Sequence, residues 1–266
     1  MPHQISLRTM DNSEEKHPGE EFFQEAASLC HERRSFLAYL KTLAPIGKTR
    51  NFVNSDEYEG DVCGFHVFIK TFANRWLPVR LFYGARCIDN EYNANAAIRA
   101  KNLARVAIPY CKPSRYTAFF QYIPNAGQLE NPRHHRDFVI PDRAFFRELI
   151  EYIRNMHKNG ICHGDLRRAN ILVGNDGHPW LVDTASAIVL PQNPGMLKKY
   201  AFKCMVRSDL FSLSKIVFSY YPDWQDEELR AAYERQPLFL KLGRYARHYL
   251  YALLRRKRRK TLKIKN

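Results

Sequence analysis

The segment of residues 163–183 constrains the fold and chemistry of this chain more than any other, and it reads HGDLRRANILVGNDGHPWLVD. It presents Asp165 on a loop after a predicted helix and Asn170 five residues later, and a predicted hairpin then returns the chain to Asp183. Mg²⁺ prefers hard oxygen ligands, and phosphoryl transfer also uses a separate carboxylate that orients the attacking hydroxyl and accepts its proton. The spacing therefore predicts Asn170 and Asp183 as metal ligands and Asp165 as the catalytic base.

The residues on either side of this segment have the pattern of a mostly helical region. Residues 141–160 predict a helix that Asp142 opens and Asn159-Gly160 ends. Residues 170–182 predict a short hairpin with a turn in its middle. From about residue 205 to 254 the pattern is mostly helical, with a break at Tyr221-Pro222.

The N-terminal half has the pattern of a smaller lobe that contains strands. Its predicted elements are a polar leader at 1–20, a helical stripe at 21–43, two or three strands within 50–72, a helix at 88–105 and a strand at 116–123. The turn-prone pair Gly60-Asp61 is expected to separate two of the strands, and Phe52-Val53 to lie in another. The small lobe is expected to end near residue 124.

The motif HGDLRRAN resembles the catalytic loop of the protein-kinase-like fold. Gly164 stands where protein kinases usually have Arg, as is common in the small-molecule kinases of that superfamily, and the 13-residue step from Asn170 to Asp183 is also similar. The resemblance implies an α+β, bilobal fold with a small β-rich N-lobe that has one main helix and a mostly helical C-lobe. The expected parts are the N-terminal helix and nucleotide-binding N-lobe (21–124), the C-lobe with the catalytic loop (125–240) and a basic helix or tail (241–266).

Two residues of the N-terminal half fit the same resemblance. The strand Val67-Phe68-Ile69-Lys70 resembles the one that delivers the phosphate-binding Lys, so Lys70 is expected to contact the phosphates of ATP. Glu91, on the following helix, is then expected to be its ion-pair partner. The alternative for any such pair taken alone is an exposed lysine at a strand end and a solvated charge on a helix.

The sequence departs from the resemblance in two places. SDEYEGDVCG stands where a Gly-rich phosphate loop is usual, which puts in doubt how tightly the nucleotide phosphates are covered. Asp183-Thr184-Ala185 stands in place of the usual Asp-Phe-Gly, which argues against the on–off switching that the Phe of that motif provides in protein kinases. His163 is expected to support the loop by hydrogen bonding and packing and not to act as the base. Asp209 is expected either to be a plain helix N-cap or to brace the catalytic loop from below.

The layout of roughly residues 60–255 resembles the bacterial lipopolysaccharide core kinases, the Kdo and heptose kinase group. The shared features are a compact N-lobe, the run of residues 80–104 rich in Arg and Ala, the hinge-like FFQYIPNAGQL and a basic C-terminal end. No Ala-Pro-Glu segment follows Asp183, which argues against a regulated protein kinase. The resemblance implies an ATP- and Mg²⁺-dependent kinase that phosphorylates a Kdo or heptose hydroxyl of the lipopolysaccharide inner core.

Two alternatives stay open. The first is another kinase of the same fold that acts on a protein or a small molecule; an aminoglycoside-type acceptor would call for an acidic pocket, whereas Arg and Lys surround this motif. The second is a catalytically inactive kinase-like binding protein, which the missing Gly-rich loop favours. Mg²⁺-dependent ATP binding separates them, because the inactive protein should show no metal-linked affinity.

The formal net charge of +15 is unevenly distributed. Residues 241–266 hold eleven Lys or Arg and no Asp or Glu, which leaves +4 for residues 1–240. Because Tyr and Leu interleave with these cations, the segment predicts docking on an anionic lipid surface. The resemblance to the lipopolysaccharide core kinases implies a core or lipid A glycolipid as partner. A solvated tail is the alternative, and nucleic acid is the least favoured partner. The cations expected to bind an anionic acceptor flank the catalytic loop and are Arg167, Arg168, Lys198 and Lys199.

The six cysteines are widely scattered, with neither a CxxC pair nor the Cys/His spacing of a zinc site, which indicates reduced thiols. The N-terminus has no apolar signal region, and no apolar stretch approaches the roughly 20 residues of a membrane-spanning helix. We therefore expect a cytoplasmic protein that associates peripherally with the cytoplasmic face of the inner membrane.

Overall fold

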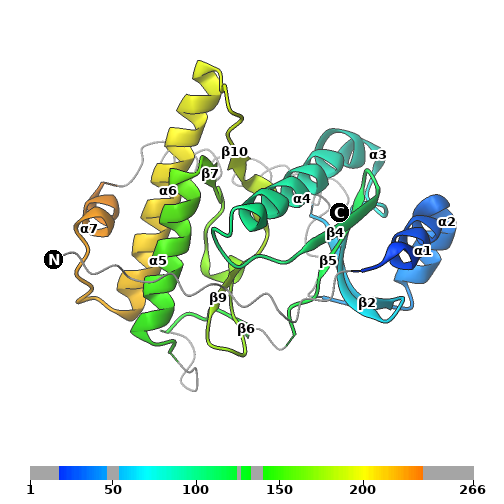
Figure 1. The fold of residues 1–266 in the computed structure, drawn as a ribbon, viewed down its shortest axis with the longest axis horizontal. Helices are drawn as coiled ribbons and strands as arrows, with labels where there is room; N and C mark the ends of the chain where they lie inside the picture. The colour runs from blue at the N-terminus through cyan, green and yellow to red at the C-terminus, as the bar shows by residue number, and fades with distance from the viewer. Residues whose placement is uncertain (1–17, 47–53, 125–126, 133–139, 236–266) are drawn as a thin grey trace, which may run out of the picture. The chain divides into compact units, whose positions relative to one another are not determined.

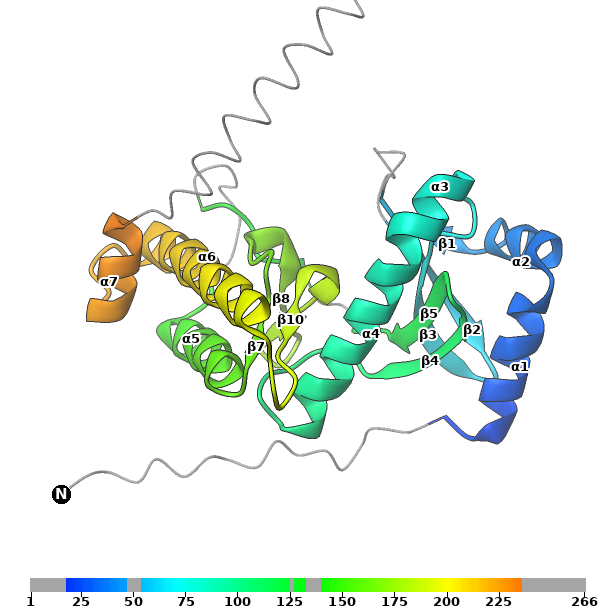
Figure 2. The same cartoon turned by 90° about the horizontal axis from the view of Figure 1, so that it is seen from above.

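The computed structural model describes residues 18–46, 54–124, 127–132 and 140–235 (Figures 1 and 2). These residues form two compact units. The N-terminal unit takes the described residues of 1–84 and 110–121, and the C-terminal unit takes those of 85–109 and 122–266. Three predictions fall outside the described residues. They concern Phe52-Val53, the basic segment 241–266 and all but the last three residues of the leader.

A five-stranded sheet forms the centre of the N-terminal unit, with the strand order β1-β2-β3-β5-β4. The strands are β1 (Ala44–Pro45), β2 (Asp56–Val62), β3 (Phe65–Thr71), β4 (Pro109–Ser114) and β5 (Thr117–Gln121). Val62 pairs with Phe65 across a two-residue turn in which Cys63 and Gly64 both have positive φ (45° and 74°). This turn matches the right-handed twist of the two strands it joins.

The prediction of a turn at Gly60-Asp61 is wrong, because both residues lie inside β2 and pair with Val67 and His66 of β3. The glycine serves packing at this position. A Cβ on Gly60 would come within 2.9 Å of the Leu43 side chain, so its absence lets Leu43 approach the strand.

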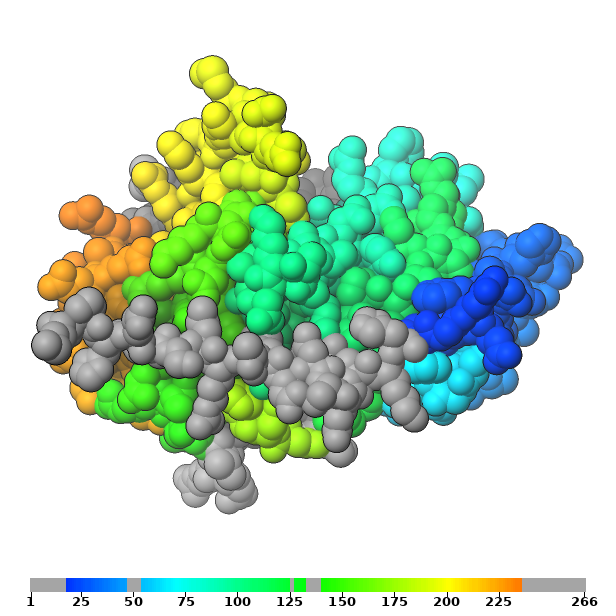
Figure 3. Space-filling model, in the orientation of Figure 1, coloured from blue at the N-terminus to red at the C-terminus, as the bar shows by residue number. Residues whose placement is uncertain are grey.

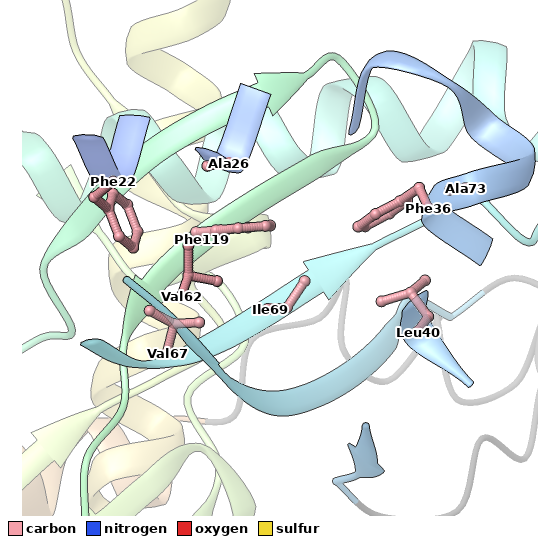
Figure 4. Close-up of a cluster of buried hydrophobic side chains, with 9 residues drawn as sticks. All are labelled: Phe22, Ala26, Phe36, Leu40, Val62, Val67, Ile69, Ala73 and Phe119. Atoms are coloured by element: carbon pink, nitrogen blue, oxygen red, sulfur yellow. The ribbon is translucent and has the colours of Figure 1, made fainter. Parts of the chain in front are cut away.

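Two helices, α1 (Glu20–His31) and α2 (Arg33–Leu40), occupy the predicted helical stripe, with a break at the extended residue Glu32. Their apolar sides pack on the sheet in a core of aromatic and branched residues (Figure 4). The buried members of this core are Phe22, Ala26, Phe36, Leu40, Val62, Val67, Ile69, Ala73 and Phe119. The short helix α3 (Leu77–Val79) and the π-helical turn η1 (Arg80–Gly84) complete the unit.

The C-terminal unit is mostly helical. Its helices are α4 (Ala85–Ala100), α5 (Arg143–Lys158), α6 (Met196–Tyr220) and α7 (Glu227–Glu234). Its short strands are β6 (Gly127–Gln128), β7 (Ile161–Cys162), β8 (Ile171–Val173), β9 (Pro179–Leu181) and β10 (Ile188–Val189), with 3₁₀ turns η2 (Arg168–Asn170) and η3 (Thr184–Ser186). They form two small sheets, β6-β8-β9 and β10-β7. The helix predicted at 88–105 is α4, and it clusters with this unit.

Several C-terminal predictions are confirmed. The Asp142 carboxylate accepts a hydrogen bond from the Phe145 amide at 2.9 Å and so caps α5. Gly160 ends the helix with a φ of 77°, and β8 and β9 form the predicted hairpin. The α+β class is therefore correct, with a β-rich N-terminal unit and a mostly helical C-terminal one. None of the described helices has both the length and the apolarity needed to cross a membrane.

Candidate active site

The structure brings Asp165, Asn170 and Asp183 together in the C-terminal unit. The buried Asn170 amide donates to the Asp165 backbone carbonyl at 2.9 Å and lies 3.4 Å from the Asp165 Oδ2 atom. The Val182 amide donates to the Asn170 carbonyl at 3.1 Å, which places Asp183 next to the same loop. The predicted hairpin therefore brings the two distant ends of the motif side by side.

The oxygen atoms of these three side chains face one positive charge, the Arg167 guanidinium. Arg167 Nε lies 3.2 Å from Asn170 Oδ1 and 3.3 Å from Asp165 Oδ2, and Arg167 Nη2 lies 3.8 Å from Asp183 Oδ2. Asp165 and Asp183 are partly open to solvent. An amide and two carboxylates that converge on a cation are the hard oxygen donors that suit Mg²⁺, so the residues fit the predicted metal.

Asp209 braces the predicted catalytic loop, which was one of the two alternatives that the sequence left open for this residue. Its Oδ2 atom accepts from the His163 amide at 2.7 Å, and its Oδ1 atom accepts from the Gly164 amide at 2.9 Å. The carboxylate is 1% exposed and also lies 3.2 Å from His157 Nε2. Asp209 lies well inside α6, so the alternative of a helix N-cap is wrong.

His163 supports the loop from its interior. The ring is fully buried, and its Nε2 atom donates to the Val182 carbonyl at 3.1 Å, because a carbonyl oxygen can only accept. This contact ties the start of the loop to the strand that leads to Asp183. The expectation that His163 has a supporting role is confirmed by these contacts.

Side-chain hydrogen bonds join helix α4 to the turn that follows Asp183. Asp183 has left-handed backbone angles (φ 58°, ψ 57°). The Asn90 side-chain amide donates to the carbonyls of Ala185 and Ala187, both at 2.7 Å. The buried Thr184 hydroxyl donates to Asn95 Oδ1 at 2.8 Å, and the Asn95 amide donates to a backbone carbonyl at 3.1 Å. These bonds form what we call the α4 clamp, made by Asn90, Asn95 and Thr184.

Lys70 and Glu91 lie in different units, so their predicted ion pair stays a prediction. Lys70 is buried in β3 and its Nζ atom lies 3.9 Å from Glu57 Oε1, on the neighbouring strand β2. Glu91 is buried in α4, and its backbone carbonyl accepts from the Thr184 hydroxyl at 3.4 Å. Burial of both charges argues against the alternative of an exposed strand-end lysine and a solvated helix charge.

The four cations predicted to contact an anionic acceptor differ in their surroundings. Arg167 faces the site as described above. Arg168 is half-buried, donates to the Ser219 hydroxyl at 2.8 Å and lies over the Tyr220 ring at 5.9 Å, which gives it a packing role. Lys198 and Lys199 are exposed in the first turn of α6. Contact of these residues with an acceptor stays a prediction.

Sequence reasoning missed Glu57 and the α4 clamp. Glu57 is paired across strands, and the clamp joins residues about ninety positions apart, so neither has a local spacing that could reveal it. One signal was present. Asparagine is unfavourable inside a helix unless its side chain has a partner, and the predicted helix holds Asn90, Asn93 and Asn95.

Comparisons with known proteins find one family model and several protein kinases. A family model described as a RIO domain matches residues 125–201, which include Asp165, Asn170 and Asp183. The chain is 29% identical over 129 residues to protein kinase PINOID 2 of Arabidopsis thaliana, covering 41% of this chain and 24% of that protein. It is 35% identical over 71 residues to the serine/threonine-protein kinase HAL4/SAT4 of Saccharomyces cerevisiae, covering 26% and 10%.

A third relative is a probable cyclin-dependent serine/threonine-protein kinase of Dictyostelium discoideum, 30% identical over 92 residues, with 30% of this chain and 14% of that protein covered. The chain thus spans less than a quarter of the length of each of these relatives. All three are kinases by name, and together with the RIO match they support a phosphotransferase with an alcohol group as acceptor. The chain is thus similar to protein kinases, and the segment that is similar to a RIO domain contains the predicted catalytic loop.

Proposed function

We propose that this protein is a kinase that transfers the γ-phosphate of ATP to an alcohol group with the help of Mg²⁺. The observation that carries the proposal is the convergence of Asp165, Asn170 and Asp183 on one cation. In this proposal Asn170 and Asp183 hold the metal, and Lys70, with Glu91 as its partner, binds the nucleotide phosphates. When bound, Mg²⁺ supplies positive charge that neutralises the phosphates.

The residues of the chain then have separate roles in the reaction. The Asp165 carboxylate orients the acceptor hydroxyl and takes its proton. Asp209 holds the loop that carries Asp165 by binding the amides of His163 and Gly164. Arg167, which contacts the oxygens of Asp165 and Asn170, would face the transferred phosphate when Mg²⁺ is bound.

For the acceptor, the comparisons support another kinase of this fold, acting on a protein or a small molecule, better than the lipopolysaccharide sugar implied by the sequence resemblance. The sugar stays a second candidate because of one structural observation. Only residues 184–195 separate Asp183 from α6, and they include η3 and β10, so this segment offers little chain to hold an extended peptide. Kdo and heptose hydroxyls of the inner core are therefore kept as acceptors to be tested.

The test of the proposal is the change Asp165→Ala, assayed by transfer of labelled γ-phosphate to a protein mixture and to purified core glycolipid. Loss of a general base should lower transfer by about a thousandfold. Asp223→Ala is the matched control, because it removes an exposed carboxylate of the same unit that pairs with Arg143. Full transfer by the Asp165→Ala protein would refute the mechanism.

Binding of ATP tests the alternative of an inactive kinase-like protein. Calorimetric titration of the wild-type protein should show ATP affinity that rises with added Mg²⁺, and Asp183→Ala should remove that rise. A wild-type protein whose ATP affinity does not respond to Mg²⁺ would favour a binding protein without catalysis.

A further inference from the structure

The first half of α6 is a projecting helix with an exposed apolar surface. Its buried residues begin only at Ser208, so residues 196–207 contain none. Figures 1 and 3 show this part of the helix, in yellow, extending past the end of α5 and standing out from its unit. Met196, Leu197 and Tyr200 are 88%, 83% and 69% exposed and rank among the five most exposed large apolar side chains of the described residues. We call these three residues the α6 tip.

The charge around the α6 tip has one sign. Lys198, Lys199, Lys203 and Arg207 are all exposed, and no Asp or Glu occurs between Thr184 and Ser208. Apolar side chains that stand in water beside several cations are typical of segments that bind anionic lipid interfaces. Each Lys or Arg near such a surface strengthens binding roughly fivefold.

We propose that the α6 tip inserts into an anionic lipid surface and that the neighbouring cations bind its headgroups. A second copy of the chain is a poorer partner, because a twofold contact would bring the four cations of each copy against one another. A protein partner is also a poorer fit, since stable protein interfaces bury about 800 Å² per side, and a helix end that projects offers a small convex surface. A lipid surface accepts a convex insert without a preformed groove.

Further along the same helix, a side chain of α6 contacts the predicted catalytic loop. Met205 lies against Gly164, because a Cβ built on that glycine would be 3.2 Å from Met205 Cε. At a rise of about 1.5 Å per residue, Met196 lies roughly 14 Å along the helix from this contact. A lipid surface at the α6 tip would therefore leave the site within reach of a hydroxyl on a lipid-linked headgroup. This second step rests on the proposed kinase function, whereas lipid binding by the tip does not.

The test is vesicle co-sedimentation of the full chain without nucleotide, using phosphatidylcholine vesicles with and without phosphatidylglycerol. The triple variant Met196→Ser, Leu197→Ser, Tyr200→Ser should bind anionic vesicles at least about tenfold more weakly than the wild type. The matched control is Ile140→Ser with Tyr233→Ser, which changes exposed apolar side chains of the same unit (50% and 51%) and should leave vesicle binding unchanged. Equal binding by the triple variant would overturn the proposal.

Hydrogen exchange locates the contact within the wild-type chain, where residues 241–266 are a competing lipid site. Anionic vesicles should slow amide exchange in residues 196–207. Protection confined to residues 241–266 would overturn the proposal. So would protection confined to residues 76–83 of the other unit, which include the exposed apolar side chains Trp76, Leu77, Leu81, Phe82 and Tyr83. The proposal would also be overturned if an acidic protein slowed amide exchange in residues 196–207 and anionic vesicles did not. Because neither experiment contains ATP, loss of kinase activity would not affect its outcome.

Discussion

Gly164 occupies a position in the catalytic loop that no other residue can occupy without movement of the backbone. Its φ is +81°, which side chains rarely adopt, and a Cβ would lie 2.3 Å from the Ser186 carbonyl oxygen. Its amide is also held by Asp209. This contact explains why glycine follows His163 here, where protein kinases usually have the larger Arg. The loop and the turn after Asp183 approach so closely that a side chain does not fit between them.

Gly164→Ala is therefore expected to destabilise the protein by about 3 kcal/mol, since it adds a steric clash to the cost of about 1 kcal/mol for left-handed backbone. Chemical denaturation of both proteins measures the difference. Gly177→Ala is the matched control, because Gly177 has a φ of +76° with no atom within 4 Å of the added Cβ. Equal losses of stability in the two variants would mean that the close approach to Ser186 is not a constraint.

At the scale of residues, the sequence predicted the part of the site that one continuous segment carries. Asp165, Asn170 and Asp183 lie within 21 residues, and the hairpin signals between them are local, so their grouping could be foreseen. Arg167 lies in the same segment, but its position among the three oxygens depends on side-chain direction, which spacing does not give. Glu57 and Asn95 act across long stretches of chain, where a single sequence holds no pattern.

At the scale of elements, the α4 clamp joins the helix that carries Glu91 to the turn that carries Asp183. The usual Asp-Phe-Gly is replaced here, and Thr184 provides a hydroxyl that is fully buried and bonded to Asn95. Asn90 adds two bonds to the same turn from one amide group. The clamp therefore ties the backbone on the far side of Asp183 to α4 through side-chain hydrogen bonds.

Thr184→Val keeps the shape of the side chain and removes the donor, leaving Asn95 Oδ1 buried without that bond. We expect a loss of about 1–3 kcal/mol in stability. If the clamp positions Asp183, the Mg²⁺ concentration for half-maximal ATP binding should also rise by about fivefold, a loss of roughly 1 kcal/mol. Titration calorimetry at several Mg²⁺ concentrations measures this rise.

Ser214→Ala is the control for a purely structural effect, because it removes a buried hydroxyl bonded to the Phe211 carbonyl at 2.8 Å in α6. It should lower stability without changing the Mg²⁺ requirement. If Thr184→Val behaves in the same way, the clamp has no role in holding Asp183.

The start of α6 shows why element boundaries were harder to predict than element types. The sequence pattern placed the helix from about residue 205, whereas it begins at Met196. Periodicity reveals a helix through its buried residues, and none of residues 196–207 is fully buried. For the same reason Asp209 was placed at a helix start, when it lies in the interior and faces the loop. An exposed helix is thus a local structure that apolar spacing cannot detect.

At the scale of the whole molecule, each unit has cysteine thiols in or against its core: Cys30 and Cys111 are partly buried in the N-terminal unit, and Cys162 is buried in the C-terminal unit. Burial, with the neighbouring Cys111 as a second cause, raises the pKa of Cys30 in the N-terminal unit to about 12. Burial raises the pKa of Cys111 to about 12 as well. In the C-terminal unit, burial and then the charge of Asp209 raise the pKa of Cys162 to about 12. Both units therefore respond to alkaline pH.

The direction of the response follows from the difference between the folded and unfolded thiols. The unfolded thiols lose their protons near pH 9.0, while the folded ones keep theirs to about pH 12. Above the unfolded pKa the native state binds more protons than the unfolded state, so stability falls as pH rises. Below about pH 8 this contribution is complete and constant. Calorimetric scans under reducing conditions should show melting temperatures that decrease steadily from pH 8.5 upward.

The change Cys162→Ala separates the thiol effect from general alkaline unfolding in the C-terminal unit. Without its thiol, that unit should lose less stability between pH 8.5 and 10 than in the wild type, even if the substitution lowers its stability at pH 7.5. Cys63→Ala is the control, since the Cys63 thiol, whose pKa its hydrogen bond to Glu25 raises to about 11, lies in the other unit and should not affect the pH slope of the C-terminal one. A pH slope for the C-terminal unit that Cys162→Ala leaves unchanged would show that other groups, such as the buried tyrosines Tyr152 and Tyr220, control its alkaline stability.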